Sequence, residues 1–170
     1  NEDRSVKVVL LRGNGKAFCA GRDIAAAPTE EDLTSVQAVA QAIVGLSKPV
    51  VAAVHGWTVG AGLEWMLNAD VVIAASSARF KLPEASLGVF VTGGLIATLP
   101  AYVGVARAKA LMLLGDEFSA EDAQSWGLIW RVVEPEKLEP ESELITQKLA
   151  SLKPDLAARF KRALNEVGLH

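Results

Sequence analysis

Short runs of consecutive apolar residues alternate along the chain with longer segments in which apolar residues recur every three or four positions. Solid apolar runs of this length are typical of buried β-strands, whereas the longer period is that of an amphipathic helix. The predicted strands cover residues 6–12, 50–54, 71–74, 80–82 and 128–133. The alternation of these strands with helical segments predicts an α/β fold.

Several helix boundaries follow from capping signals. Thr29 with Asp32 predicts a capping box that opens a helix, which Pro49 ends. Ser119 with Asp122 predicts a second capping box, and residues 138–167 predict two amphipathic helices separated at Pro154. The helix that Thr29 opens has an apolar face formed by Leu33, Val36, Ala40, Ile43 and Val44.

Composition narrows the possible functions. The 170 residues include 17 basic and 20 acidic side chains, so the net charge is −3, and no basic cluster indicates a nucleic-acid partner. Cys19, His55 and His170 are too few for a zinc site, so no metal is expected. The uninterrupted apolar runs are far shorter than the roughly 20 residues that span a bilayer, so no membrane association is expected.

Common catalytic motifs are missing from the sequence. The run Gly13-Asn14-Gly15-Lys16 has the spacing of neither a dinucleotide fingerprint nor a P-loop, and a turn is the better interpretation. No serine lies in a GxSxG context. His55 could act as a base, but a histidine that closes a buried strand is more often a packing residue.

Two glycine-containing corners, at residues 16–23 and 60–64, could present backbone N–H groups to a ligand. Glu64 falls in the first turn of a predicted helix and Glu84 follows Pro83. Each acid alone is ordinary at a helix start. Two such corners together with two acids, beside largely apolar sequence, fit oxyanion stabilisation with proton transfer next to it.

The chain resembles the crotonase superfamily, also called the enoyl-CoA hydratase/isomerase family, over nearly all of its length. The resemblance rests on ordered blocks at family spacing: residues 17–23, 48–56 running into 60–64, 70–75, 80–84 with Leu87-Gly88, and Gly115 with 119–123 and 126–128. It implies a spiral of ββα units with C-terminal helices, and an acyl-CoA thioester as substrate. Coenzyme A is then part of the substrate, and no separate cofactor is expected.

The resemblance also implies site residues. The backbone N–H groups of Ala20 and Ala61 correspond to the family's oxyanion hole, and Glu64 and Glu84 to the two glutamates of the members that hydrate a double bond. Binding of the CoA ester is implied for Ala20, Gly21, Arg22, Asp23, Gly60 and Ala61. An enoyl-CoA hydratase is therefore the main hypothesis. The alternatives are a Δ3-Δ2 enoyl-CoA isomerase that uses one glutamate, matching Glu84, and a non-catalytic acyl-CoA-binding subunit.

Some features depart from the family pattern. Thr92 stands where a backbone-exposing glycine is usual, and Trp57, Trp65 and Phe90 add bulk near the corners. Residues 1–170 are interpreted as one crotonase-like core domain without the usual N-terminal strands and last C-terminal helices. The family implies a homotrimer or hexamer. Residence in the cytoplasm is expected, and the mitochondrial matrix would fit the same sequence.

Overall fold

A computed structural model describes residues 1–27, 29–91 and 93–168. The larger of its two sheets has four parallel strands in the order β1-β2-β4-β7. All five residues of β2 are buried, as expected for a central strand of a covered parallel sheet. The strands are β1 (Val9–Arg12), β2 (Val50–Val54), β4 (Val71–Ala75) and β7 (Arg131–Val133). Their order confirms the predicted α/β class, although β1 and β7 are shorter than predicted.

The smaller sheet combines β3 (Trp57–Val59), β5 (Arg79–Lys81) and β6 (Phe118–Ser119). β3 pairs with β5 in parallel, and β5 pairs with β6 in antiparallel orientation. The buried ring of Phe80 stacks on Phe118 at a centroid distance of 5.3 Å, which joins two of these strands through the core. β3 and β6 were not predicted, because three and two residues are too few to show an apolar period.

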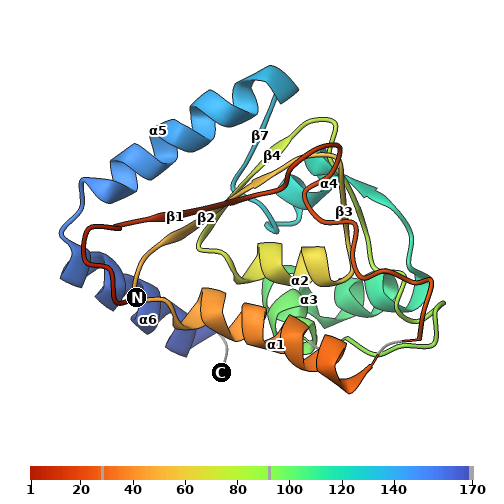
Figure 1. Cartoon of the computed structure of the whole chain (residues 1–170). Coiled ribbons are helices and arrows are strands. Elements are labelled where there is room, and N and C mark those ends of the chain that lie inside the picture. The colour runs from red at the N-terminus through yellow and green to blue at the C-terminus, as the bar shows by residue number, and fades with distance from the viewer. Residues whose placement is uncertain (28, 92, 169–170) are drawn as a thin grey trace.

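Helices cover both faces of the larger sheet (Figure 1). One side carries α5 (Leu138–Ala150), and the other carries α1 (Glu30–Gly45), α2 (Ala61–Asn68) and α3 (Leu95–Leu114). Leu63 and Met66 of α2 are fully buried, and so are Leu95 and Leu99 of α3. Apolar burial on this side therefore fixes α2 between the sheet and α3.

The first capping box is confirmed. The Thr29 hydroxyl accepts a hydrogen bond from the Asp32 N–H at 3.1 Å, and the Asp32 carboxylate accepts one from the Thr29 N–H at 2.9 Å. The expected end of this helix at Pro49 was wrong. The helix ends at Gly45 because Leu46 adopts an extended backbone, which leaves residues 46–49 as a connection into β2.

The second capping box is confirmed as well, at the start of α4 (Ala120–Ser125). A short 3-10 turn, η1 (Pro135–Lys137), then leads into α5. The predicted break at Pro154 is also confirmed, because α6 (Pro154–Gly168) begins there.

A buried lysine fastens α6 to the rest of the fold. The Lys161 ammonium donates to the carbonyls of Ile43 at 2.8 Å and Lys48 at 3.2 Å, and forms an ion pair with Asp70 at 2.9 Å. Asp70 also accepts a hydrogen bond from the N–H of Val50 at 2.7 Å. One cation thereby ties α6 to the end of α1 and to the start of β2.

α3 is the longest helix that the structure describes, and its composition is strongly apolar. Its length and hydropathy would allow it to cross a membrane. Core helices of soluble proteins have the same length and hydropathy, so these two properties alone do not identify a membrane span. Gly104 has φ 75° and ψ 157° and interrupts the helical geometry. The sequence predicted helical structure after Gly93-Gly94 but no segment long enough to span a bilayer, because Arg107 and Lys109 interrupt the apolar run.

Candidate active site

One pocket of about 100 Å³ brings together every predicted site residue except Asp23. The members that sequence reasoning named are Ala20, Gly21, Arg22, Gly60, Ala61, Glu64 and Glu84. Asp23 does not line the pocket; its exposed carboxylate accepts a hydrogen bond from the N–H of Ala25 at 2.9 Å. Residues separated by more than sixty positions in the sequence thus meet at one site.

The two glycine-containing corners meet through β3. Cys19 forms an isolated parallel bridge with Thr58, and the Val59 N–H donates to the Cys19 carbonyl at 2.9 Å. β3 then leads directly into α2, so Ala20 and Ala61 border the same pocket. Across the three described ranges, no hydrogen bond uses the N–H of Ala20 or of Ala61. Both N–H groups can therefore donate to a ligand oxygen.

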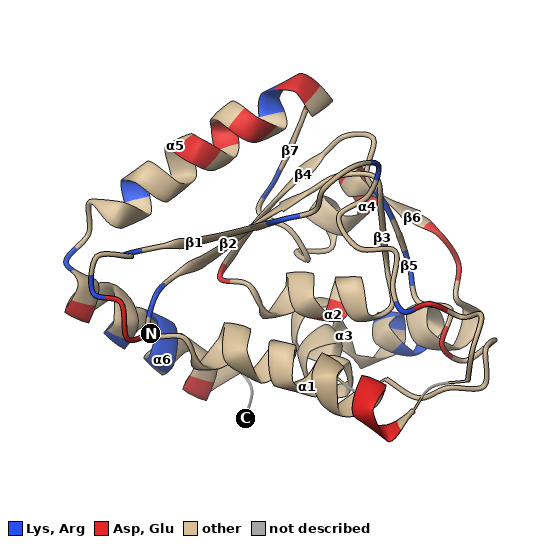
Figure 2. Cartoon of the chain, in the orientation of Figure 1, with Lys and Arg blue, Asp and Glu red and all other residues tan. Residues whose placement is uncertain are grey.

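Glu64 lies on the first turn of α2 and is only 2% exposed. It is the single charged residue of that helix, which Figure 2 draws mostly in the tan of uncharged residues. The backbone of Gly93 packs directly against its carboxylate, since a Cβ atom at position 93 would overlap the Glu64 Oε2. Asn68, one turn further along α2, holds that backbone by donating to the Gly93 carbonyl at 3.3 Å.

Glu84 reaches the pocket from the turn that follows Pro83. Its Oε1 lies so close to Gly60 that a Cβ atom there would stand 2.7 Å away, and Gly60 also has a φ of 55°. The Oε2 of Glu84 is buried and has no hydrogen-bond partner within residues 1–27, 29–91 and 93–168. Burial raises the pKa of the Glu84 carboxyl, against a smaller opposing effect of a backbone hydrogen bond. The site thus contains a carboxyl group that keeps its proton to a higher pH than an ordinary glutamate does.

Apolar side chains complete the walls of the pocket. Leu33 and Val36 contribute from α1, and the segment after Glu84 contributes Leu87, Val89, Phe90 and Val91. Sequence reasoning placed Leu33 and Val36 on the apolar face of a helix and missed their position at the site. An apolar wall lowers the local dielectric, which strengthens a hydrogen bond to a developing negative charge.

Other candidates from the sequence have different positions. The Nε2 of His55 lies 2.8 Å from the Gly15 carbonyl, and His55 is outside the pocket, which agrees with its interpretation as a packing residue. Of the three bulky aromatics, Phe90 lines the pocket, whereas Trp57 and Trp65 do not. Thr92 lies outside the described residues. In the part of the chain that the structure describes, His, Cys, Asp and Glu side chains form no metal-binding group of three or more.

Comparison with known proteins decides the family. A sequence model described as enoyl-CoA hydratase/isomerase matches residues 1–167. The chain belongs to the enoyl-CoA hydratase/isomerase family. It is 36% identical over 173 residues to the 1,2-epoxyphenylacetyl-CoA isomerase of Escherichia coli (strain K12), covering 96% of this chain and 66% of that protein. It is 38% identical over 176 residues to the crotonyl-CoA hydratase of Syntrophomonas wolfei, covering 99% of this chain and 67% of the relative.

Solved structures of the family share the fold. An enoyl-CoA hydratase from Mycobacterium avium subsp. paratuberculosis K-10 superposes with a TM-score of 0.94 at 34% identity, covering 99% of this chain and 69% of that chain. An enoyl-CoA hydratase from Bacillus anthracis gives a TM-score of 0.91 at 34% identity, with coverages of 99% and 70%. These likenesses confirm the crotonase-like architecture. The chain spans about two thirds of the length of these relatives.

Proposed function

We propose that this enoyl-CoA hydratase/isomerase family member adds water across the α,β double bond of an enoyl-CoA thioester. The observation that carries the proposal is the meeting of Glu64 and Glu84 at one small apolar pocket. The backbone N–H groups of Ala20 and Ala61 at the same pocket, which donate to no other described residue, support it. A related protein of 38% identity is a crotonyl-CoA hydratase.

In the proposed reaction the thioester oxygen accepts hydrogen bonds from the N–H groups of Ala20 and Ala61. Negative charge builds on that oxygen as water attacks Cβ, so these bonds strengthen in the transition state. Each such donor contributes about 3 kcal/mol to transition-state stabilisation in well-studied oxyanion holes. The donors here are backbone groups on two segments joined by β3, so they need little reorganisation during the reaction.

The two glutamates divide the proton transfers. Ionised Glu64 orients the water and takes its proton while the hydroxyl oxygen bonds to Cβ, and the enolate then receives a proton at Cα from Glu84. The raised pKa of Glu84 supports its role as the acid, because a carboxyl protonated at higher pH can donate. One proton enters Glu64 and one leaves Glu84, so exchange with solvent restores the starting state after each turnover.

Binding of the CoA portion is assigned to the loop beside the oxyanion hole. Ala20, Gly21, Arg22 and Gly60 line the pocket, and the Arg22 guanidinium donates to the Ala26 carbonyl at 3.0 Å, which shapes the loop. Asp23 is placed in this role by family resemblance, and its exposed carboxylate suits contact with the solvent-facing part of a CoA ester better than contact with the acyl group.

The test follows crotonyl-CoA and a 3-enoyl-CoA by thioester absorbance and product mass. Loss of conjugated absorbance from crotonyl-CoA, with a product heavier by one water, is the expected result. A gain of absorbance from the 3-enoyl ester at unchanged mass would instead favour isomerisation, the reaction type in the name of the Escherichia coli relative. Binding of both esters without turnover would favour a non-catalytic acyl-CoA-binding subunit.

Three further properties belong to the proposal. The reaction as written uses no cofactor beyond the CoA carried by the substrate. A homotrimer or hexamer is the proposed assembly, supported by the apolar side chains that α3 and α6 leave exposed. The cytoplasm is the proposed location, supported by the single cysteine among 170 residues.

A further inference from the structure

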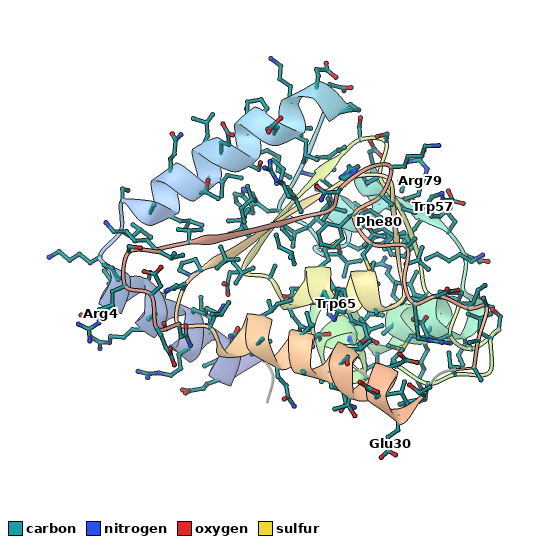
Figure 3. All side chains as sticks on the ribbon, viewed as in Figure 1. Arg4, Glu30, Trp57, Trp65, Arg79 and Phe80 are labelled. Carbon is teal, nitrogen blue, oxygen red and sulfur yellow. The ribbon has the colours of Figure 1, made fainter. Side chains whose placement is uncertain are left out.

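Trp65 stands next to Glu64 on α2 and reaches the neighbouring helix. Its indole Nε1–H donates to the Val36 carbonyl in the middle of α1 at 3.2 Å. Figure 3 shows Trp65 on α2 where that helix runs beside α1. Carbonyls in the middle of a helix already accept an intrahelical hydrogen bond, so this contact adds a tether between the helices without satisfying a helix end.

The tether acts at the wall of the pocket. Val36, whose carbonyl accepts the bond, lines the pocket with its own side chain, and Leu33 lines it one turn earlier on the same face of α1. Glu64 lines it from α2. The separation of α1 and α2 therefore sets the space between the apolar wall and the proposed catalytic acid.

That space is small. The whole pocket, including the part beside Ala20 and Gly60, has a volume of about 100 Å³, below the roughly 300 Å³ at which small-molecule pockets usually begin. It suits a short acyl group rather than a long fatty acyl chain. A longer chain that lay along Val36 and Leu33 would push α1 away from α2, and the Trp65 hydrogen bond resists that movement.

We propose that Trp65 is a positioning residue that limits the substrate to short acyl-CoA esters by holding α1 against α2. This inference rests on the proposed function, because it concerns the acyl group of the same substrate. Trp65 does not line the pocket, so it acts through the position of Val36 and Leu33 rather than by touching the substrate.

The test compares Trp65→Phe with the wild type on crotonyl-CoA and trans-2-octenoyl-CoA. Phenylalanine keeps an aromatic ring at this position and removes the indole N–H donor. The ratio of kcat/KM for the octenoyl ester to that for the crotonyl ester is expected to rise about tenfold, the lower end of the effect of methylene groups in an apolar pocket. Trp126→Phe is the matched control, since Trp126 packs on Phe118 and Arg107 outside the pocket and its loss leaves the ratio unchanged.

A second variant and a second readout keep the inference separate from folding and from turnover. Leu33→Ala shortens a partly exposed wall residue, and it is expected to shift the ratio in the same direction. Calorimetric dissociation constants for octanoyl-CoA and butyryl-CoA give the same comparison without catalysis. A wild type that binds these esters but hydrates neither enoyl ester would overturn the proposed function alone. Unchanged rate and binding ratios in Trp65→Phe would overturn the role of Trp65, whatever Leu33→Ala shows.

Discussion

Gly93 is the position where a single added carbon atom would disturb the proposed catalysis most. Its backbone occupies the space beside the Glu64 carboxylate, and the Asn68 side chain holds it there. The backbone of Gly60 likewise lies beside the Glu84 carboxylate, where an added Cβ atom would stand 2.7 Å from Oε1. Both carboxyl groups are thus positioned by backbone that approaches them closely, which only glycine allows.

Gly93→Ala is expected to lower kcat for crotonyl-CoA hydration about a hundredfold, because the new methyl group displaces the Glu64 carboxylate from its position. Steady-state kinetics measure this effect, and KM is expected to change little. Gly45→Ala serves as the control, since a Cβ atom at Gly45 meets no other atom within 4 Å. Wild-type turnover by the Gly93 variant would contradict the assigned position of Glu64.

Glu84 links function to stability. Its pKa is raised by burial, so the folded protein keeps the proton at pH values where the unfolded chain has already released it. The free energy of unfolding therefore falls as the pH rises from below the ordinary pKa of a glutamate to above the raised pKa of Glu84. Glu84→Gln is expected to melt at a higher temperature than the wild type at pH 7, and the difference is expected to shrink towards pH 4. A lower melting temperature for the variant at pH 7 would contradict the burial effect.

At the scale of elements, α6 depends on one buried ion pair. Lys161→Met removes the cation that joins α6 to α1 and β2 and leaves the Asp70 carboxylate without its charged partner. We expect the free energy of unfolding to fall by about 3 kcal/mol, the lower end for a broken buried pair, because the Asp70 side chain keeps 20% exposure. Urea titration measures the loss. Arg162→Met, an exposed change on the same helix, is the control, and equal effects of the two changes would contradict the role of Lys161.

The elements also show how far sequence reasoning reaches. Buried strands such as β2 and β4 were predictable because every position is apolar, and both capping boxes were predictable because their side-chain spacing carries the mechanism. β3 was hidden in a glycine-rich corner, although it brings Cys19 beside Thr58 and so aligns the proposed oxyanion hole. Local patterns do not report pairing between distant segments.

The site shows the same limit. Glu64 and Glu84 each fitted an ordinary helix start, and it was resemblance to a family that placed them together. Leu33 and Val36 showed only a helical period, and nothing in that period says whether an apolar face meets the core or a substrate. The hydrogen bond from Trp65 to Val36 depends on how two helices pack, which no spacing within either helix encodes.

For the whole molecule, the distribution of exposed apolar side chains is the main feature left to explain. Leu113 and Leu114 at the end of α3 are 71% and 68% exposed, and Phe160 and Leu164 on α6 are 61% and 67% exposed. Exposed apolar residues gathered on helices are typical of surfaces that bind another protein. They support the proposed homotrimer or hexamer.

Light scattering coupled to size exclusion tests the assembly. The expected mass is three or six times the 18.0 kDa of one chain. Leu113→Glu is expected to shift the population towards the single-chain mass, because a charge at an apolar interface is costly to bury. A mass of one chain for the wild type at micromolar concentration would contradict the proposed assembly.

The measurement that tests the central claim most directly is the turnover of Glu64→Gln on crotonyl-CoA beside that of the wild type. A two-carboxylate hydratase predicts a loss in kcat of about a hundredfold or more, with binding of the CoA ester preserved, because glutamine cannot take the proton of the attacking water. Glu84→Gln is expected to show a similar loss. Full hydratase activity in Glu64→Gln would contradict the account and leave Glu64 as a buried residue of a helix start.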